Sequence, residues 1–385
     1  MKRKRVVVLG ATGSIGESAL KVAHDIPDRM EIVGLAANQN ARKLAEQANR
    51  VRPQAVCLVD ESKVDELRAA LVYEPRILTG QTGLAEIACL AEAEMVLVAV
   101  VGTGGLQPAL AAIEAGKDLA VASKEILVVA GEIVMGMAKK KGVRVLPVDS
   151  EHNAIFQCLD GASAPAVRRL ILTASGGPFR NTPAAEFDSI TLEQALRHPT
   201  WNMGPKITID SATLFNKGLE MIEAHWLFGV EMKRVEVVIH PQSIVHSMVE
   251  FGDGSVLAQM SHSDMCFPIQ YAVTWPERVP NSLPPLDFGK LRSLEFETPR
   301  TDDFPALNLA RQAGETGGTL PAVLNAANEV AVSAFLDRRI SFPRIWQTVA
   351  GVMERHAAVA HPDLDAILRA DQWARNDAAA AVQNG

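Results

Sequence analysis

The chain has 385 residues, of which 48% are hydrophobic and 22% charged, and its formal net charge is -7. This length suffices for two or three domains with their own cores, and the composition is that of an ordinary globular protein. The negative charge gives no electrostatic reason to expect binding to nucleic acid or to an anionic membrane. The longest apolar run, residues 95–101, is too short to span a bilayer.

A strand followed by a glycine-rich turn opens the chain. The β-branched run from Arg5 to Leu9 is typical of a buried parallel strand. The turn, Gly10 to Gly16, has the spacing Gly-x-x-Gly-x-x-Gly, and a helix is expected over residues 17–24. Strand, glycine turn and helix in this order form the context of a dinucleotide-binding loop, in which backbone amides meet a pyrophosphate. A tight turn without a ligand is the alternative interpretation.

The second expected strand, residues 31–36, ends without the acidic residue that would bind the ribose 2′-hydroxyl of NAD. The loop that follows contains three amides, residues 38–40, and then Arg42 and Lys43. Basic side chains suit a 2′-phosphate, so the sequence favours NADPH as the cofactor.

Further strands are expected near residues 55–59, 95–101 and 118–122, with a helix over residues 106–115. This alternation predicts the α/β class, with an N-terminal Rossmann-like, doubly wound parallel sheet. Ser123-Lys124-Glu125 follows one of these strands, and ligands of such sheets bind outside the carboxyl ends of strands. Lys124 is therefore a candidate to face the cofactor cleft, and a helix start with solvated charges is the alternative.

Two carboxylates follow the next β-branched run, residues 143–146. Asp149 and Glu151 are spaced i, i+2, which in extended backbone places both side chains on the same side. Two like charges this close need a proton or a cation between them. Hard oxygen ligands favour Mg²⁺ or Mn²⁺, so a metal site is predicted here, with a loop of solvated acids as the alternative.

After residue 153 a strand over residues 167–173 runs into a loop of small residues, 174–179. The amides of this loop and the Ser175 hydroxyl could hold an anion. The segment from His198 to Pro205 contains too many turn residues for a helix or a strand. Trp201 within it is either a core residue or part of a mobile lid over a ligand.

Asp210 and Ser211 are expected to cap a helix that ends near Phe228. A polar stripe lies next to the apolar stripe of this helix, so it should lie at the edge of the packed face, where a cleft can form. Its acids are Glu220 and Glu223. Glu220 is the candidate third carboxylate for the acid pair, and surface charge is the alternative for Glu223.

The sequence that follows this helix predicts a sheet, a linker and a helical bundle. Antiparallel strands are expected over residues 235–239, 243–251 and 255–260, in a sheet that could form a homodimer interface. The predicted divisions are an NADPH-binding domain, 1–149, a catalytic α+β domain, 150–282, a linker, 283–302, and a C-terminal helical domain, 303–385. Four cysteines without a Cys-x-x-Cys pair fit a cytoplasmic location.

Several blocks in this order resemble the 1-deoxy-D-xylulose 5-phosphate reductoisomerase family, and the resemblance covers nearly the whole chain. The blocks are Gly10 to Gly16, Ser123 to Glu125, Pro147 to Gln157, Thr173 to Arg180, His198 to Gly204, Asp210 to Trp226, His240 to Ser243 and Leu324 to Glu329. The resemblance implies that a small phosphorylated ketose, 1-deoxy-D-xylulose 5-phosphate, is rearranged and then reduced by NADPH. The product would be 2-C-methyl-D-erythritol 4-phosphate, an isoprenoid precursor.

The resemblance also implies the site residues, with Trp201 on a flap that closes over the substrate. Ligands of Mg²⁺, Mn²⁺ or Co²⁺ would be Asp149, Glu151 and Glu220, which with Lys124 form the catalytic set. Residues expected to bind the substrate are Lys124, Ser150, Glu151, Ser175, His198, Trp201, Ser211, Asn216, Lys217 and Glu220. Residues expected to bind NADPH are Thr12, Gly13, Ser14, Ile15, Asn38, Gln39, Asn40, Ser123, Glu125 and Gly204.

The sequence departs from the family pattern in two places. The loop over residues 38–40 lacks the usual glycine and basic residue, so the preference for NADP depends on Arg42 or Lys43. His262 stands where a Gly-x-Pro type of turn is more usual, and a solvated loop is expected there.

Two other classes of protein remain open. A semialdehyde dehydrogenase that reduces acyl phosphates would need an activated cysteine, and Cys158 lies in a helix-like stretch. The second class is a non-catalytic NADP-binding sensor, in which the three acids Asp149, Glu151 and Glu220 would have no role.

Overall fold

The structure is a computed structural model that describes residues 3–161, 166–201 and 203–383, so Asn202 of the expected flap lies outside the described residues. The chain divides into two compact units. Unit 1 comprises Met1–Ile126, Val134–Asn153 and Asp264–Pro284, and unit 2 comprises Leu127–Ile133, Ala154–Ser263 and Pro285–Gly385. The finer division into four parts stays a prediction.

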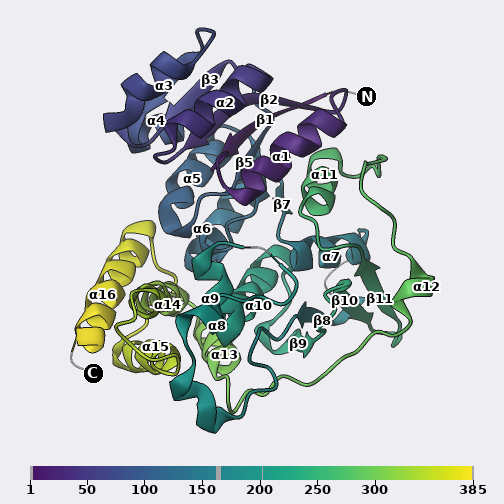
Figure 1. Cartoon of the computed structure of the whole chain (residues 1–385), viewed down its shortest axis with the longest axis vertical. Coiled ribbons are helices and arrows are strands. Elements are labelled where there is room, and N and C mark those ends of the chain that lie inside the picture. The colour runs from purple at the N-terminus through teal and green to yellow at the C-terminus, as the bar shows by residue number, and fades with distance from the viewer. Residues whose placement is uncertain (1–2, 162–165, 202, 384–385) are drawn as a thin grey trace. The chain divides into compact units, whose positions relative to one another are not determined.

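A seven-stranded sheet with the order β4-β3-β2-β1-β5-β6-β7 forms the core of unit 1 (Figure 1). All neighbouring strands are parallel. The strands are β1 Lys4–Leu9, β2 Met30–Ala37, β3 Ala55–Leu58, β4 Arg76–Thr79, β5 Met95–Val98, β6 Asp118–Val121 and β7 Val145–Pro147. The strand order proceeds outward from β1 in both directions, which is the predicted doubly wound topology. Ligands of such sheets bind where the order reverses, beside β1 and β5.

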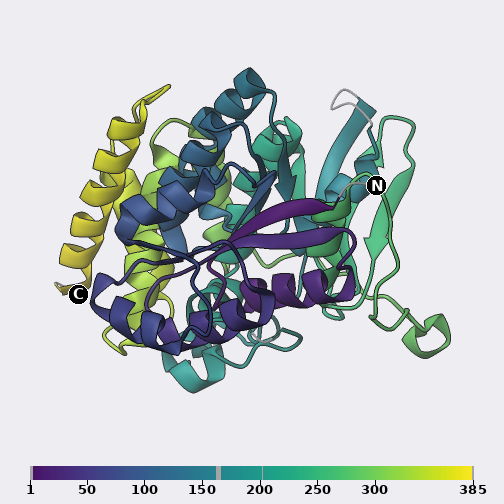
Figure 2. The same ribbon diagram turned by 90° about the horizontal axis from the view of Figure 1, so that it is seen from above.

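Helices connect the strands of unit 1, as parallel pairing requires. They include α1 Ser14–Asp25, α2 Ala41–Val51, α3 Val64–Ala70, α4 Gly80–Ala88 and α5 Leu106–Glu114, with the short 3₁₀ helices η1 Glu61–Lys63 and η2 Gly102–Gly105. Helix α11, Cys266–Thr274, belongs to the same unit but follows all of its strands in the chain, and it packs against α1. Helix α1 packs on β1 and β2, and it is the purple helix beside the purple strands in Figure 2. Helices α6, Glu125–Lys141, and α7, Ser150–Leu159, contribute residues to both units.

Unit 2 contains a four-stranded sheet with the order β11-β10-β8-β9. Its strands are β8 Val167–Ala174, β9 Val235–Ile239, β10 Val245–Phe251 and β11 Val256–Met260. Strand β10 is antiparallel to both of its neighbours, but β9 runs parallel to β8. The predicted antiparallel pairing is therefore confirmed for β10 and β11, but it is wrong for β9, which pairs with β8 and runs parallel to it. In the described part of the chain, three α-helices and two 3₁₀ helices separate β8 from β9. A connection of this length can return the chain in a parallel direction.

The helices of unit 2 pack largely around α14. The helices are α8 Leu192–Ala195, α9 Pro205–Thr213, α10 Phe215–Phe228, α12 Phe288–Leu291, α13 Ala306–Thr316, α14 Leu320–Leu336, α15 Arg344–Arg355 and α16 Leu364–Gln383, with η4 Ala184–Ser189 and η5 Met232–Arg234. Helix α14 packs against α13, α15 and α16, which confirms the predicted helical C-terminal region (Figure 1). No helix in the described part of the chain is long and apolar enough to span a membrane.

One helix was expected from Asp210 and Ser211 to near Phe228, but the structure has two helices in this region. Helix α9 begins at Pro205, a residue that is compatible with the first helical position, and it ends at Thr213. Leu214 then adopts a left-handed conformation with φ 67°, and α10 begins after it. The predicted cap is therefore wrong, because both residues lie inside α9.

Candidate functional site

The glycine loop of unit 1 has two positions that exclude any side chain. Gly10 has φ +89°, and a Cβ added there would lie 2.2 Å from the carbonyl oxygen of Ala99. A Cβ on Gly16 would lie 2.2 Å from the carbonyl oxygen of Ala11. Gly13 precedes α1 with an ordinary φ of -83°. The backbone therefore makes a tight turn into the N-terminus of α1, where helix amides and the helix dipole favour a bound phosphate.

The other residues predicted to bind the cofactor lie mainly at carboxyl ends of strands in unit 1. Thr12 and Gly13 lie in the turn, Ser14 and Ile15 begin α1, and Asn38, Gln39 and Asn40 follow β2. Ser123 is buried after β6 and donates a hydrogen bond to the carbonyl of Val100 at 2.5 Å. Glu125 begins α6 in unit 1, whereas Gly204 precedes α9 in unit 2.

The two predicted 2′-phosphate ligands lie at the start of α2. Arg42 Nε lies 2.8 Å from Glu66 Oε1, and Lys43 Nζ lies 2.5 Å from Glu17 Oε1. Arg42 is exposed and Lys43 is half-buried. Ion pairs at such positions contribute little to stability, so both cations can exchange these partners for a phosphate.

The acid pair of unit 1 lies where β7 passes into α7. Asp149 occupies the turn before α7, and Glu151 lies in the first turn of the helix. The backbone is therefore not extended as predicted, yet one oxygen from each carboxylate lies within 4.8 Å of the other. Lys124 Nζ donates to Asp149 Oδ2 at 2.5 Å, and Ser150 Oγ donates to Glu151 Oε2 at 2.5 Å. Two hard oxygen donors at this spacing suit a divalent cation.

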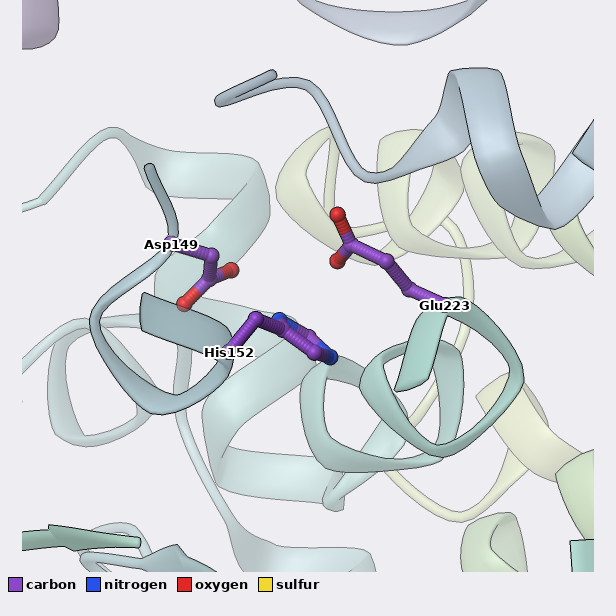
Figure 3. A group of neighbouring side chains, drawn as sticks. All are labelled: Asp149, His152 and Glu223. Atoms are coloured by element: carbon purple, nitrogen blue, oxygen red, sulfur yellow. The ribbon is translucent and has the colours of Figure 1, made fainter. Parts of the chain in front are cut away.

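The sequence interpretation gave no role to His152, which is fully buried on the first turn of α7 (Figure 3). One of its ring nitrogens lies within 4.8 Å of a carboxylate oxygen of Asp149. Its place three residues after Asp149 was the only signal in the sequence, because residues three apart share one face of a helix.

The small-residue loop of unit 2 follows β8 and packs against α9. Gly176 and Gly177 have φ +82° and +66°, so the loop uses two left-handed residues. A Cβ on Gly177 would lie 2.9 Å from the carbonyl oxygen of Ser211. The amide of Gly177 donates to Ser175 Oγ at 3.2 Å. This close approach brings the predicted anion-binding loop to Ser211.

His198 contacts both serines. The amides of Thr200 and Trp201 donate to His198 Nδ1 at 3.2 and 2.9 Å, so the ring proton is on Nε2. Nε2 lies 3.1 Å from Ser175 Oγ and 3.0 Å from Ser211 Oγ. Burial lowers the pKa of His198 from 6.5 to about 4, so the ring is neutral near pH 7. A neutral ring that donates to the hydroxyl oxygens leaves their protons available for an anion.

The lowered pKa of His198 predicts a pH-dependent stability. In the unfolded chain the ring binds a proton below about pH 6.5, but in the folded chain only near pH 4. The free energy of unfolding should therefore be greatest above pH 6.5 and decrease as the pH falls toward 4. Urea denaturation of wild type and His198→Gln across this range measures the effect, and the variant should lose less stability on acidification. Equal losses would contradict a buried neutral ring.

Helix α10 carries the third predicted acid and its partners. Glu220 is fully buried, and it accepts a hydrogen bond from Asn216 Nδ2 at 2.6 Å and one from the ammonium of Lys217. Asn216 Oδ1 is a buried acceptor with no hydrogen-bond partner among the described residues. Glu223 also lies on α10 (Figure 3) and is fully buried, so the alternative of a surface charge is wrong. The polar stripe is therefore a buried cluster of ionisable groups.

Trp201 is half-buried, so it is not a core residue. Its ring centroid lies 6.4 Å from that of His246 on β10, and the hydroxyls of Thr200 and Ser243 lie 3.3 Å apart. The sequence interpretation gave no role to His246 or Ser243, because their contacts with this segment are distant in the chain. His262, expected in a solvated loop, is half-buried.

The cysteines do not resemble activated nucleophiles. Burial raises the pKa of the Cys57 and Cys266 thiols to about 12, and it also raises the pKa of Cys89. A catalytic cysteine needs a lowered pKa. Cys158 is buried on α7, which gives a substrate no access to it. The semialdehyde dehydrogenase alternative therefore lacks its nucleophile.

Three features together define an NAD(P)-dependent α/β enzyme. They are a doubly wound sheet with a glycine loop, an acid pair suited to a cation, and a serine-histidine cluster suited to an anion. A family model of 1-deoxy-D-xylulose 5-phosphate reductoisomerase matches residues 6–131. Models of the C-terminal domain of this enzyme match residues 145–228 and 260–377. The chain belongs to the 1-deoxy-D-xylulose 5-phosphate reductoisomerase family, which confirms the prediction from the sequence.

Relatives and solved structures agree with this assignment over the full length. The chain is 53% identical over 375 residues to the reductoisomerase of Pelotomaculum thermopropionicum, with 97% of each chain covered. It is 54% identical over 381 residues to that of Symbiobacterium thermophilum, with 98% of each covered. The Zymomonas mobilis enzyme in complex with NADPH matches with a TM-score of 0.93 and 44% identity over 99% of each chain. A DOX-P reductoisomerase in complex with NADPH, fosmidomycin and magnesium matches with a TM-score of 0.94 and 40% identity, covering 99% of this chain and 98% of that one. The predicted fold class is confirmed.

Proposed function

We propose that the chain converts 1-deoxy-D-xylulose 5-phosphate into 2-C-methyl-D-erythritol 4-phosphate with NADPH and a divalent cation. The observation that carries this proposal is the match of nearly the whole chain to reductoisomerases, at 53% and 54% identity for two of them. The expectation of NADPH and a divalent metal agrees with the ligands of the solved structures that match.

The glycine loop fits a dinucleotide. Side chains at Gly10 and Gly16 would collide with the backbone, so the turn stays bare and the pyrophosphate can approach the amides at the start of α1. Contacts with NADPH are assigned to Thr12, Gly13, Ser14, Ile15, Asn38, Gln39, Asn40, Ser123, Glu125 and Gly204. Arg42 and Lys43 are the proposed source of charge for the 2′-phosphate. When bound, NADPH supplies the hydride for the reduction.

Three carboxylates are proposed to hold the cation: Asp149 and Glu151 of unit 1 and Glu220 of unit 2. All their donors are hard oxygens, which suit Mg²⁺ or Mn²⁺ and also accept Co²⁺. When bound, the cation polarises the substrate ketone and acidifies its hydroxyl. Lys124 donates to Asp149, and Ser150 donates to Glu151, so both ligands are oriented by hydrogen bonds.

The substrate phosphate is proposed to bind the serine-histidine cluster of unit 2. The His198 ring proton engages the oxygens of Ser175 and Ser211, so both hydroxyls can donate their protons to the phosphate. Lys217 adds positive charge. Asn216 Oδ1 can accept a hydrogen bond from a substrate hydroxyl, because no described residue donates to it.

The segment around Trp201 is proposed to be the flap that closes over the substrate. An indole over the site excludes water, which strengthens the electrostatic interactions within it and protects the reactive aldehyde. The half-buried position of Trp201 is compatible with this movement.

Oxidation of NADPH by the purified protein tests the proposal. Absorbance is followed with 1-deoxy-D-xylulose 5-phosphate and Mg²⁺ or Mn²⁺, and with EDTA as the control. Consumption should require both the substrate and the metal, with 2-C-methyl-D-erythritol 4-phosphate as the product. Binding of NADPH without consumption under any metal would retain the nucleotide site and reject the reaction, which is the result expected of a non-catalytic sensor.

The enzyme is further proposed to form a homodimer through the sheet of unit 2. Strand β11 is an edge strand, paired only with β10 in the sheet, and its Val256 and Leu257 are 47% and 51% exposed. An exposed apolar edge strand favours pairing with another chain. Phe288 and Phe296 add exposed aromatic surface within the same unit.

Leu257→Glu should shift the protein from dimer to monomer in sedimentation velocity, because it places a charge in a desolvated apolar interface. Glu236→Gln, a change on the opposite edge strand β9, is the control and should leave the dimer intact. A wild-type protein that sediments as a monomer at micromolar concentration would reject the dimer.

A cytoplasmic location is also proposed. Cys57, Cys89 and Cys266 are free thiols, as expected in a reducing compartment. Alkylation of these thiols in protein isolated without reductant, read by mass spectrometry after denaturation, would test this.

A further inference from the structure

The motif Leu324 to Glu329 on α14 has no role in the reaction as proposed. Helix α14 is otherwise largely apolar, yet Asn325 and Asn328 within it are fully buried. A buried amide costs stability unless it forms hydrogen bonds, so each asparagine needs a specific partner.

Asn328 forms its hydrogen bond with α9. Its Nδ2 donates to Asp210 Oδ1 at 2.8 Å, and Lys206 Nζ lies 2.6 Å from Asp210 Oδ2. An ionised carboxylate only accepts hydrogen bonds, so the asparagine must direct its NH₂ group toward Asp210. Its own Oδ1 is buried and has no hydrogen-bond partner among the described residues. The side chain therefore serves as a donor to one carboxylate on another helix.

Asp210 and Ser211 are consecutive residues of α9. A contact that holds the Asp210 side chain therefore fixes the rotation of the helix, and with it the direction in which the Ser211 side chain points. Helix α9 has nine residues and cannot extend beyond Thr213, because Leu214 is left-handed. Its rotation about its own axis is therefore set by side-chain contacts, among them the hydrogen bond by which the Asp210 carboxylate, 1% exposed, is held by α14. A small rotation would move Ser211 Oγ away from His198 and from the loop at Gly177.

We propose that Asn328 is a positioning residue, which holds Asp210 and thereby places Ser211 Oγ for the substrate phosphate. This inference rests on the proposed function, in which Ser211 binds that phosphate. A displacement of about 1 Å at a reacting or binding group can cost up to about 10²-fold in activity. A residue that only stabilises the fold would change the melting temperature and leave the Michaelis constant for the substrate unchanged.

Asn328→Leu tests the proposal, with Asn325→Leu as the matched control. Asn325 lies on the same helix, is equally buried and donates to a carboxylate, Glu329, at 3.0 Å, but that partner is on α14 itself. Asn328→Leu should raise KM for 1-deoxy-D-xylulose 5-phosphate about tenfold, with kcat and KM for NADPH near wild type. Asn325→Leu should lower the melting temperature to a similar extent and leave KM for the substrate unchanged.

A second arm tests whether the effect passes through Ser211. In a Ser211→Ala background, Asn328→Leu should change KM very little, because residues that act through one group are not additive. Independent, multiplicative effects would overturn the proposal, as would equal KM changes in the two leucine variants. If Asn328→Leu does not fold, Asn328→Ser, too short to reach Asp210, is compared with Asn325→Ser under the same criteria. A wild type without turnover would instead reject the proposed function.

Discussion

Glu220→Gln is expected to reduce kcat/KM for 1-deoxy-D-xylulose 5-phosphate by about 10²- to 10³-fold, the range seen when one preorganised electrostatic group is removed. The carboxylate of Glu220 is fully buried and already oriented by Asn216 and Lys217. An amide of the same shape keeps the packing but removes the negative charge that the cation requires. Turnover as a function of Mn²⁺ concentration, with Mn²⁺ binding measured by electron paramagnetic resonance, separates lost metal affinity from lost chemistry.

Glu223→Gln is the matched control for this prediction. Glu223 lies on the same helix and is equally buried, but it is not a proposed ligand. Its replacement should leave the affinity for Mn²⁺ within a few fold of wild type. If Glu223→Gln abolishes Mn²⁺ binding and Glu220→Gln does not, the metal ligand is one position further along the polar stripe. The melting temperatures of both variants show whether the loss of a buried charge has altered the fold.

The parts of the fold that depend on local signals were predictable. The β-branched run before Gly10 and the turn that follows need only neighbouring residues to specify strand, turn and helix. The parallel pairing of β9 with β8 was not predictable, because the residues that pair in these two strands lie more than 60 positions apart in the chain. The break at Leu214 was also missed, because no local pattern favours a left-handed leucine, and tertiary packing must stabilise it.

In the candidate site too, features set by neighbouring residues were predictable, and features set by contacts distant in the chain were not. Asp149 and Glu151 were identified as a pair, but their geometry comes from a helical turn and not from an extended strand. The stripe on α10 identified Glu220 and Glu223 without revealing that both are fully buried, because periodicity gives the direction of a side chain and not what covers it. The contacts of His198 with Ser175 and Ser211 join three separate segments, so no pattern within one segment could predict them.

Gly10→Ala is the second change with a large expected effect, and it should lower the free energy of unfolding by about 3 kcal/mol or more. The residue needs φ +89°, and the new Cβ would lie 2.2 Å from the carbonyl oxygen of Ala99. That oxygen belongs to backbone beside β5, at the centre of the sheet, so it cannot move away as a flexible side chain would. Urea denaturation measures the loss of stability, and fluorescence titration with NADPH should show loss of binding, because the turn must shift.

Gly13→Ala in the same loop separates steric strain from a general intolerance of side chains. Gly13 has φ -83°, which any residue adopts, and the nearest atom to an added Cβ is the carbonyl oxygen of Gly10 at 3.5 Å, an ordinary contact. Its replacement should change the free energy of unfolding by no more than about 0.5 kcal/mol. Any loss of NADPH affinity in this variant would then report contact with the cofactor and not a damaged turn. Equal destabilisation by the two alanines would contradict the assignment of strain to Gly10, since only that position combines a left-handed φ with a collision against the sheet.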